Sequence, residues 1–111
     1  MDRIGEYREI VKRIIREYAE FDPSTGEVEA ETVFDDEHGH YELLYTGWEK
    51  WRRIHGSVIH IDIRDGKVWI QHDGTSDGVA PELVEAGIPR EHIVLAFHPP
   101  SKRQYTGFAV A

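Results

Sequence analysis

Histidine and aspartate side chains alternate with aliphatic ones in the stretch HIDIRDGKVWIQHDGT, residues 60–75. His60 and Asp62 are two residues apart, so on a β-strand both side chains point to the same face. An imidazole beside a carboxylate is a pair that binds transition metals or transfers protons. His72 follows in the next segment, and a metal-dependent, nuclease-like enzyme built on His60, Asp62 and His72 is therefore one hypothesis for function.

The sequence lacks the spacings of known catalytic and metal-binding motifs. It has no cysteine, no His-Glu-x-x-His, no calcium-loop pattern and no Gly-x-Ser-x-Gly. A nuclease of the Asp…Glu-x-Lys type needs a second acid on the strand that follows Asp62, and the segment KVWIQH has none. We therefore predict no catalytic residues, no metal ligands and no cofactor, and expect a protein that is not an enzyme.

The same stretch predicts a β-hairpin. Asp65-Gly66 suits a type I′ turn, in which both residues have positive φ. A two-residue turn places Arg64 opposite Lys67 and, further along, His60 opposite Gln71. One face is then aliphatic (Ile59, Ile61, Ile63, Val68, Ile70), and the other carries His60, Asp62, Arg64, Lys67, Trp69 and Gln71.

The polar face of this hairpin has a tryptophan in its middle. If one helix covers the aliphatic face, the polar face stays open and Trp69 is exposed beside polar groups, as is typical of protein interfaces. The sequence therefore predicts a partner-binding surface formed by His60, Asp62, Arg64, Trp69 and Gln71. The alternative is that the late segment PPSKRQYTGF folds back and covers Trp69 within the same chain.

The elements that position this hairpin follow from hydrophobic periodicity. Residues 3–20 carry apolar side chains at three- and four-residue steps, which predicts an amphipathic helix capped by Asp2 and strengthened by a Glu9–Arg13 pair. Residues 27–34 and 41–48 predict two strands, the segment VAPELVEAG a short helix capped by Asp77, and IVLAFH a buried strand. The expected fold is a single α+β domain, residues 1–111, in which a mainly antiparallel sheet of about five strands packs one face against the long N-terminal helix.

Charge and composition narrow the classes of function. The chain of 111 residues has 13 Lys and Arg against 21 Asp and Glu, a net charge of −8. An acidic protein repels duplex DNA, so direct nucleic-acid binding is not expected, although Arg8, Lys12 and Arg16 with Arg52 and Arg53 leave a DNA-binding accessory protein as an alternative. The sequence shows no membrane span or signal peptide, and with no cysteine it suits the cytoplasm.

Nearly the whole chain resembles a known family. Residues 7–19, 47–75 and 78–111 are similar to the XisI-like proteins, the fdxN element excision controlling factors of cyanobacteria. The most specific parts are His60-Ile61-Asp62-Ile63, the run DGK-WIQ-DGT, the segment IVLAFHPP and the closing TGFAV.

The resemblance implies a role in programmed excision of a DNA element during heterocyst development. It also implies an XisH-like partner protein, and it supplies no catalytic residues. We therefore expect a non-enzymatic controlling factor that acts through protein–protein contacts with an XisH-like protein and forms a homodimer through its open sheet face.

Overall fold

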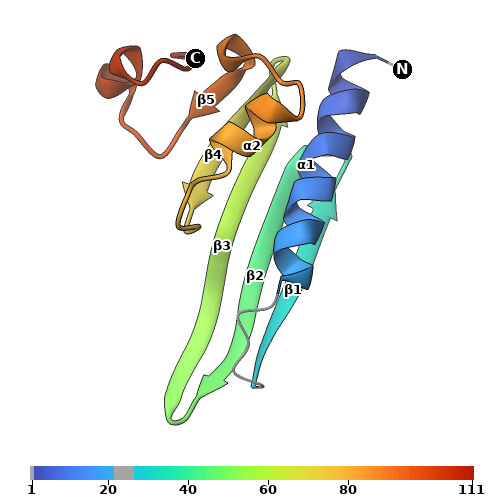
Figure 1. Cartoon of the computed structure of the whole chain (residues 1–111), viewed down its shortest axis with the longest axis vertical. Helices are drawn as coiled ribbons and strands as arrows, with labels where there is room; N and C mark the ends of the chain where they lie inside the picture. The colour runs from blue at the N-terminus through green and yellow to red at the C-terminus, as the bar shows by residue number, and fades with distance from the viewer. Residues whose placement is uncertain (1, 22–26) are drawn as a thin grey trace.

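A computed structural model describes residues 2–21 and 27–111. It shows a five-stranded sheet in the order β1-β2-β3-β4-β5 with two helices on one face (Figure 1). The expected α+β fold is confirmed, and its sheet is antiparallel except for the last pair, β4 with β5. The elements are α1 (Arg3–Glu20), β1 (Val28–Asp35), β2 (His40–Glu49), β3 (Arg52–Arg64), β4 (Lys67–Asp73), α2 (Ala80–Glu85), β5 (Ile93–Leu95) and the 3₁₀ helices η1 (Arg90–His92) and η2 (Pro100–Tyr105).

Helix α1 begins and ends where the sequence predicts. The Asp2 carboxylate accepts a hydrogen bond from the Gly5 backbone N–H at 2.6 Å, which is the predicted N-cap. The predicted Glu9–Arg13 pair is wrong: Glu9 lies 3.5 Å from the Lys12 ammonium, and Arg13 lies 3.5 Å from the next carboxylate along the helix. Lys12 also donates to the carboxylate of Asp36, in the turn after β1, at 2.7 Å.

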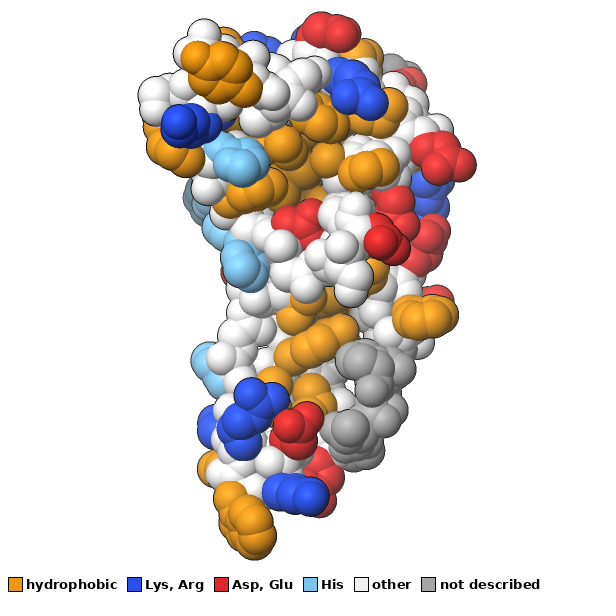
Figure 2. All heavy atoms as spheres, turned by 60° about the vertical axis from the view of Figure 1, so that its left-hand side comes forward, with side chains coloured by type: hydrophobic (Ala, Val, Ile, Leu, Met, Phe, Trp, Pro, Cys, Tyr) orange, Lys and Arg blue, Asp and Glu red, His pale blue; other side chains and the backbone are white. Residues whose placement is uncertain are grey.

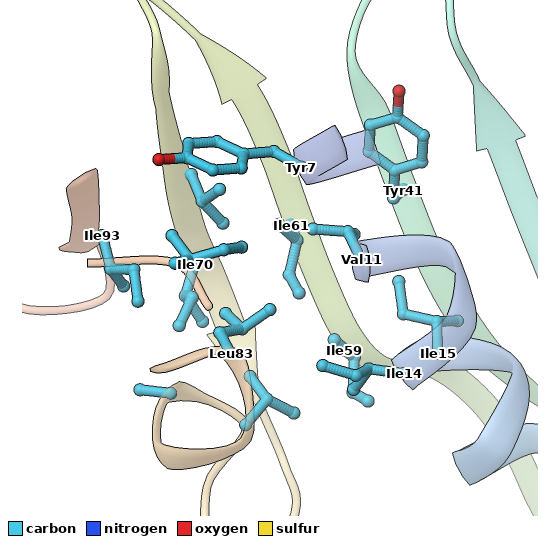
Figure 3. Packing of buried hydrophobic residues seen from close by; sticks show 14 of the residues in the cluster. Tyr7, Val11, Ile14, Ile15, Tyr41, Ile59, Ile61, Ile70, Leu83 and Ile93 are labelled. Carbon is cyan, nitrogen blue, oxygen red and sulfur yellow. The ribbon is translucent and has the colours of Figure 1, made fainter. Parts of the chain in front are cut away.

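The core lies between the helices and the near face of the sheet (Figure 3). The predicted aliphatic face of the hairpin is buried there, and it packs against the apolar stripe of α1. Each such aliphatic side chain stabilises the fold by roughly 1.5–3 kcal/mol relative to its exposed state. The central members of this core are Val11, Ile15, Ile59, Ile61 and Ile70.

The β3–β4 hairpin has the predicted turn and most of the predicted register. Asp65 and Gly66 have φ of 53° and 77°, as a type I′ turn requires. The pairing follows the prediction from the turn as far as Ile61, which lies opposite Ile70. A β-bulge follows, so that His60 lies opposite His72, and the predicted pairing of His60 with Gln71 is wrong.

The β2–β3 hairpin extends beyond the part of the sheet that the helices cover (Figure 1). It turns at Lys50 (φ 57°) and Trp51, and it extends well past the end of α1 (Figure 1). Strand β1 pairs with β2 from Val28 opposite Gly47, toward the tip, to Asp35 opposite His40, where α1 covers the sheet.

The chain after β4 returns to the sheet through α2. Asp77 does not cap this helix as predicted; instead the Asp73 carboxylate accepts hydrogen bonds from the backbone N–H of Val79 at 2.8 Å and of Thr75 at 3.0 Å. Helix α2 has no side-chain cap, and Asp73 holds the loop before it because Asp73 ends β4 and so has a fixed position beside that loop. Strand β5 then pairs parallel to β4. Among residues 2–21 and 27–111, no helix is long and apolar enough to cross a membrane.

Candidate functional site

Trp69 lies on the predicted face of the sheet, but it is buried. Only 7% of it is exposed, its indole N–H donates to the Arg64 carbonyl oxygen at 3.2 Å, and the Arg64 guanidinium lies 4.1 Å from the ring centroid. The guanidinium of Arg103, from η2, lies 5.8 Å from the same ring. The predicted exposure of Trp69 is therefore wrong, and the alternative that the late segment covers it is confirmed.

The covering segment is itself fixed to the sheet by Arg103. Its guanidinium donates to the His98 carbonyl oxygen at 3.0 Å and to the Ala96 carbonyl oxygen at 3.4 Å. Ala96 in turn donates its backbone N–H to the Ile70 carbonyl oxygen at 2.9 Å. The far face of β4 is thus closed by the chain's own C-terminal residues.

The remaining predicted residues form a polar cluster around Asp62. This carboxylate is only 8% exposed, and its Oδ1 lies 2.8 Å from His60 Nε2 and 2.7 Å from His40 Nδ1. Its second oxygen, Oδ2, accepts a hydrogen bond from the Gln71 side-chain amide at 3.2 Å. Three neighbours therefore satisfy one largely buried carboxylate, as buried charge requires.

The structure brings His40 into this cluster, and sequence reasoning missed it. His40 lies opposite Asp62 in the β2–β3 pair, and Glu42 lies opposite His60. The side-chain carboxylate of Glu42 is 4.0 Å from His60 Nδ1. His72, which the enzyme hypothesis required, is not among the three metal-binding side chains that converge within the described part of the chain.

Asp62 raises the pKa of the exposed His40 side chain. The hydrogen bond to Asp62 is the largest cause that raises the pKa of His40 above its usual value, followed by the negative charge of Asp62 itself. Asp35 and Glu42 act in the same direction. The cluster is thus a site of negative potential that favours a positive charge at His40, whether a proton or a metal ion supplies it.

A second exposed feature is the hairpin tip, defined as Trp48–Arg53 at the β2–β3 turn. Trp51 is 92% exposed and Trp48 is 47% exposed, with the Arg53 guanidinium 5.2 Å from the Trp48 ring centroid. Figure 2 shows that the narrow end of the molecule carries Lys and Arg side chains, with Asp and Glu side chains among them and a hydrophobic one at its extremity; Arg52 pairs with Glu49 there at 3.1 Å. Aromatic and cationic groups thus meet on a projecting element.

The basic side chains proposed for DNA contact do not form one surface. The Lys12 side chain is 12% exposed and donates to the Asp36 carboxylate at 2.7 Å. The Arg16 guanidinium lies 5.2 Å from the ring centroid of Phe34 on β1. Both therefore pack against the chain's own sheet, whereas Arg52 and Arg53 lie at the hairpin tip, beyond the end of α1.

Comparison with known proteins agrees with this fold. The family model for the XisI protein matches residues 1–110. The chain belongs to the XisI family. This confirms the resemblance found in the sequence.

Two solved XisI-family structures from Anabaena variabilis ATCC 29413 superpose on the whole chain. One, an XisI-like protein, is 44% identical with a TM-score of 0.92, and the match covers 99% of this chain and 100% of that one. The other, described as the fdxN element excision controlling factor XisI, is 33% identical with a TM-score of 0.86, also over 99% and 100%. A search of curated proteins found no match.

Proposed function

We propose that this XisI-family protein controls the excision of a DNA element in the cytoplasm, without catalysing a reaction itself. The observation that carries the proposal is its full-length similarity to the fdxN element excision controlling factor, at 33% identity. Its overall charge of −8 supports action on a protein rather than on the DNA duplex. The partner we propose is an XisH-like protein.

The hairpin tip is the surface we assign to this partner. The burial of Trp69 moves the aromatic anchor of the interface to Trp48 and Trp51, which are exposed and lie among Lys50, Arg52 and Arg53. Tryptophan and arginine are the residues that most often dominate binding energy at interfaces. The complementary partner surface is an acidic one with an apolar pocket.

The polar face of the β3–β4 hairpin, which the sequence predicted as the binding surface, is also part of the proposal. Arg64 remains exposed above Trp69, while His60 and Gln71 are partly buried around Asp62. These side chains lie on the same sheet face as Trp48. Their cluster includes His40, which contacts Asp62, and His40 and Trp48 are eight positions apart on one strand, an even number. We propose that these side chains form the rim of the partner contact, and that the part of this face left uncovered by the C-terminal segment pairs two copies of the chain when the partner is absent.

Co-purification with the XisH-like protein tests the proposal. The chain and its partner are co-expressed, the complex is isolated through a tag on the partner, and its mass gives the stoichiometry. We expect the double variant Trp48→Ala/Trp51→Ala to bind at least tenfold more weakly, since each interface anchor contributes about 2 kcal/mol. The matched control is Phe97→Ala, because Phe97 is also 47% exposed but follows β5 in the C-terminal segment.

Three results would contradict the proposal. One is a complex that forms equally well with the double variant, which would remove the hairpin tip from the interface. Another is a monomeric chain that retains no partner. The third is salt-sensitive binding of duplex DNA by the wild type, weakened by Arg52→Ala and Arg53→Ala, which would instead support direct DNA binding.

A further inference from the structure

We propose that His40, His60 and Asp62 bind one divalent transition-metal ion of the zinc type. This site is separate from the hairpin tip, and it goes beyond the role in excision control. Each of the three side chains offers one ligand atom, and these atoms all lie within 4.8 Å of one another. The three residues come from adjacent positions on β2 and β3.

The distances between the three ligand atoms would suit a metal ion if the histidine nitrogens moved slightly away from the Asp62 carboxylate. His40 Nδ1 and His60 Nε2 lie 2.7 and 2.8 Å from the same oxygen of Asp62. Around tetrahedral Zn²⁺ with bonds of about 2.0–2.1 Å, neighbouring ligand atoms are about 3.3 Å apart. His40 can supply this adjustment, since its side chain is 57% exposed and is free to rotate away from the carboxylate.

The surroundings of the three ligands resemble the outer shell of known metal sites. Zinc-bound histidines commonly direct their second ring nitrogen at a carboxylate, and ligating carboxylates are themselves hydrogen-bonded. His60 directs Nδ1 at the Glu42 carboxylate, 4.0 Å away, while Nε2 faces Asp62. Gln71 holds the other oxygen of Asp62 at 3.2 Å, which leaves Oδ1 directed at the two histidines.

The ligand types select the class of metal. Imidazole nitrogens suit Zn²⁺, Cu²⁺, Ni²⁺ and Fe²⁺, whereas Mg²⁺ and Ca²⁺ prefer oxygen ligands alone. Three protein ligands leave a fourth position of a tetrahedral ion for water or an external group. The bound ion would connect β2 to β3 at the open end of the long hairpin, away from its tip.

Titration of tag-free protein tests this site, because a histidine tag would bind the same ions. The wild type is titrated with Zn²⁺ by calorimetry and with Co²⁺ by its visible absorption, and the thermal midpoint is measured with and without Zn²⁺. We expect one ion per chain, at least tenfold weaker binding by His40→Ala and His60→Ala, and a Zn²⁺-dependent rise in midpoint that both variants lose.

The matched control is His55→Ala, an exposed histidine of the same β3 strand that lies outside the cluster. This variant should bind Zn²⁺ as the wild type does. The proposal would be overturned by an absence of binding, or by equal loss in all three variants, which would indicate nonspecific binding to surface histidines. Binding of the XisH-like partner does not enter this test, so the two proposals can fail separately.

Discussion

Replacement of Trp69 by alanine should cost the fold much of its stability. The indole is 93% covered, it donates one hydrogen bond to the Arg64 carbonyl oxygen, and the guanidinium groups of Arg64 and Arg103 lie against its ring. Truncation of a buried tryptophan costs about 3–5 kcal/mol, and each lost cation–π contact adds about 0.5–1 kcal/mol at a partly exposed site. A domain of this size has only about 5–15 kcal/mol in total, so the variant should be close to unfolded at 37 °C.

Urea unfolding followed by far-ultraviolet circular dichroism measures this loss, since the signal does not depend on the other two tryptophans. The matched control is Trp51→Ala, because that indole is 92% exposed and its removal should change stability by less than about 0.5 kcal/mol. A loss below about 1 kcal/mol for Trp69→Ala, with an unchanged slope, would refute the reasoning. It would mean that the C-terminal segment does not cover the ring in solution.

Three further predictions concern single residues. Gly39→Ala should destabilise the fold by roughly 2–3 kcal/mol in urea unfolding, because Gly39 has φ of 72° and an added Cβ would collide with the Ile63 carbonyl oxygen. Asp73→Ala should lower the calorimetric midpoint through a loss of roughly 2–3 kcal/mol, since it removes three hydrogen bonds of the loop before α2, whereas exposed Asp77→Ala should leave the midpoint unchanged. The hydrogen bond from Lys12 lowers the pKa of Asp36. The stability that this carboxylate adds to the fold is therefore fully present above the unfolded-state pKa of about 3.9, and it is lost as pH falls through the lower pKa of the folded state. Unfolding curves of the wild type and Asp36→Asn should therefore differ at pH 7 and approach each other as the pH falls into the acid range, and a constant difference would contradict the assignment.

The sequence predicts those parts of the fold that depend on neighbouring residues. The cap at Asp2, the helical stripe and the turn at Asp65-Gly66 each follow from local spacing, and each is confirmed. The predicted register fails at His60, because a β-bulge between His60 and Ile61 shifts the pairing and the turn residues do not encode it. The prediction for Asp77 also fails on tertiary structure: Asp73 is seven residues before Ala80, but its position at the end of β4 lets its carboxylate accept the Val79 N–H.

The candidate site required knowledge of tertiary structure. His60 and Asp62 are two residues apart, so the sequence placed them together correctly. His40 is 22 residues from Asp62, and only the β2–β3 register brings the two side chains together. The prediction for Trp69 was wrong because the same sequence pattern fits two cases: a tryptophan at a protein interface, and a tryptophan covered by another part of its own chain. Only the path of the C-terminal segment distinguishes the two.

The strand order has a consequence for how the chain folds. From β1 to β4 every strand pairs with the one before it, so each step closes only a short loop and costs little entropy. Strand β5 is different, because it joins β4 only after the chain has passed through α2 and η1. Pairings that span more of the sequence form more slowly, so among the strands of the sheet we expect β5 and the segment after it to join last. Trp69 lies beneath that segment, so its fluorescence would report the final step of folding.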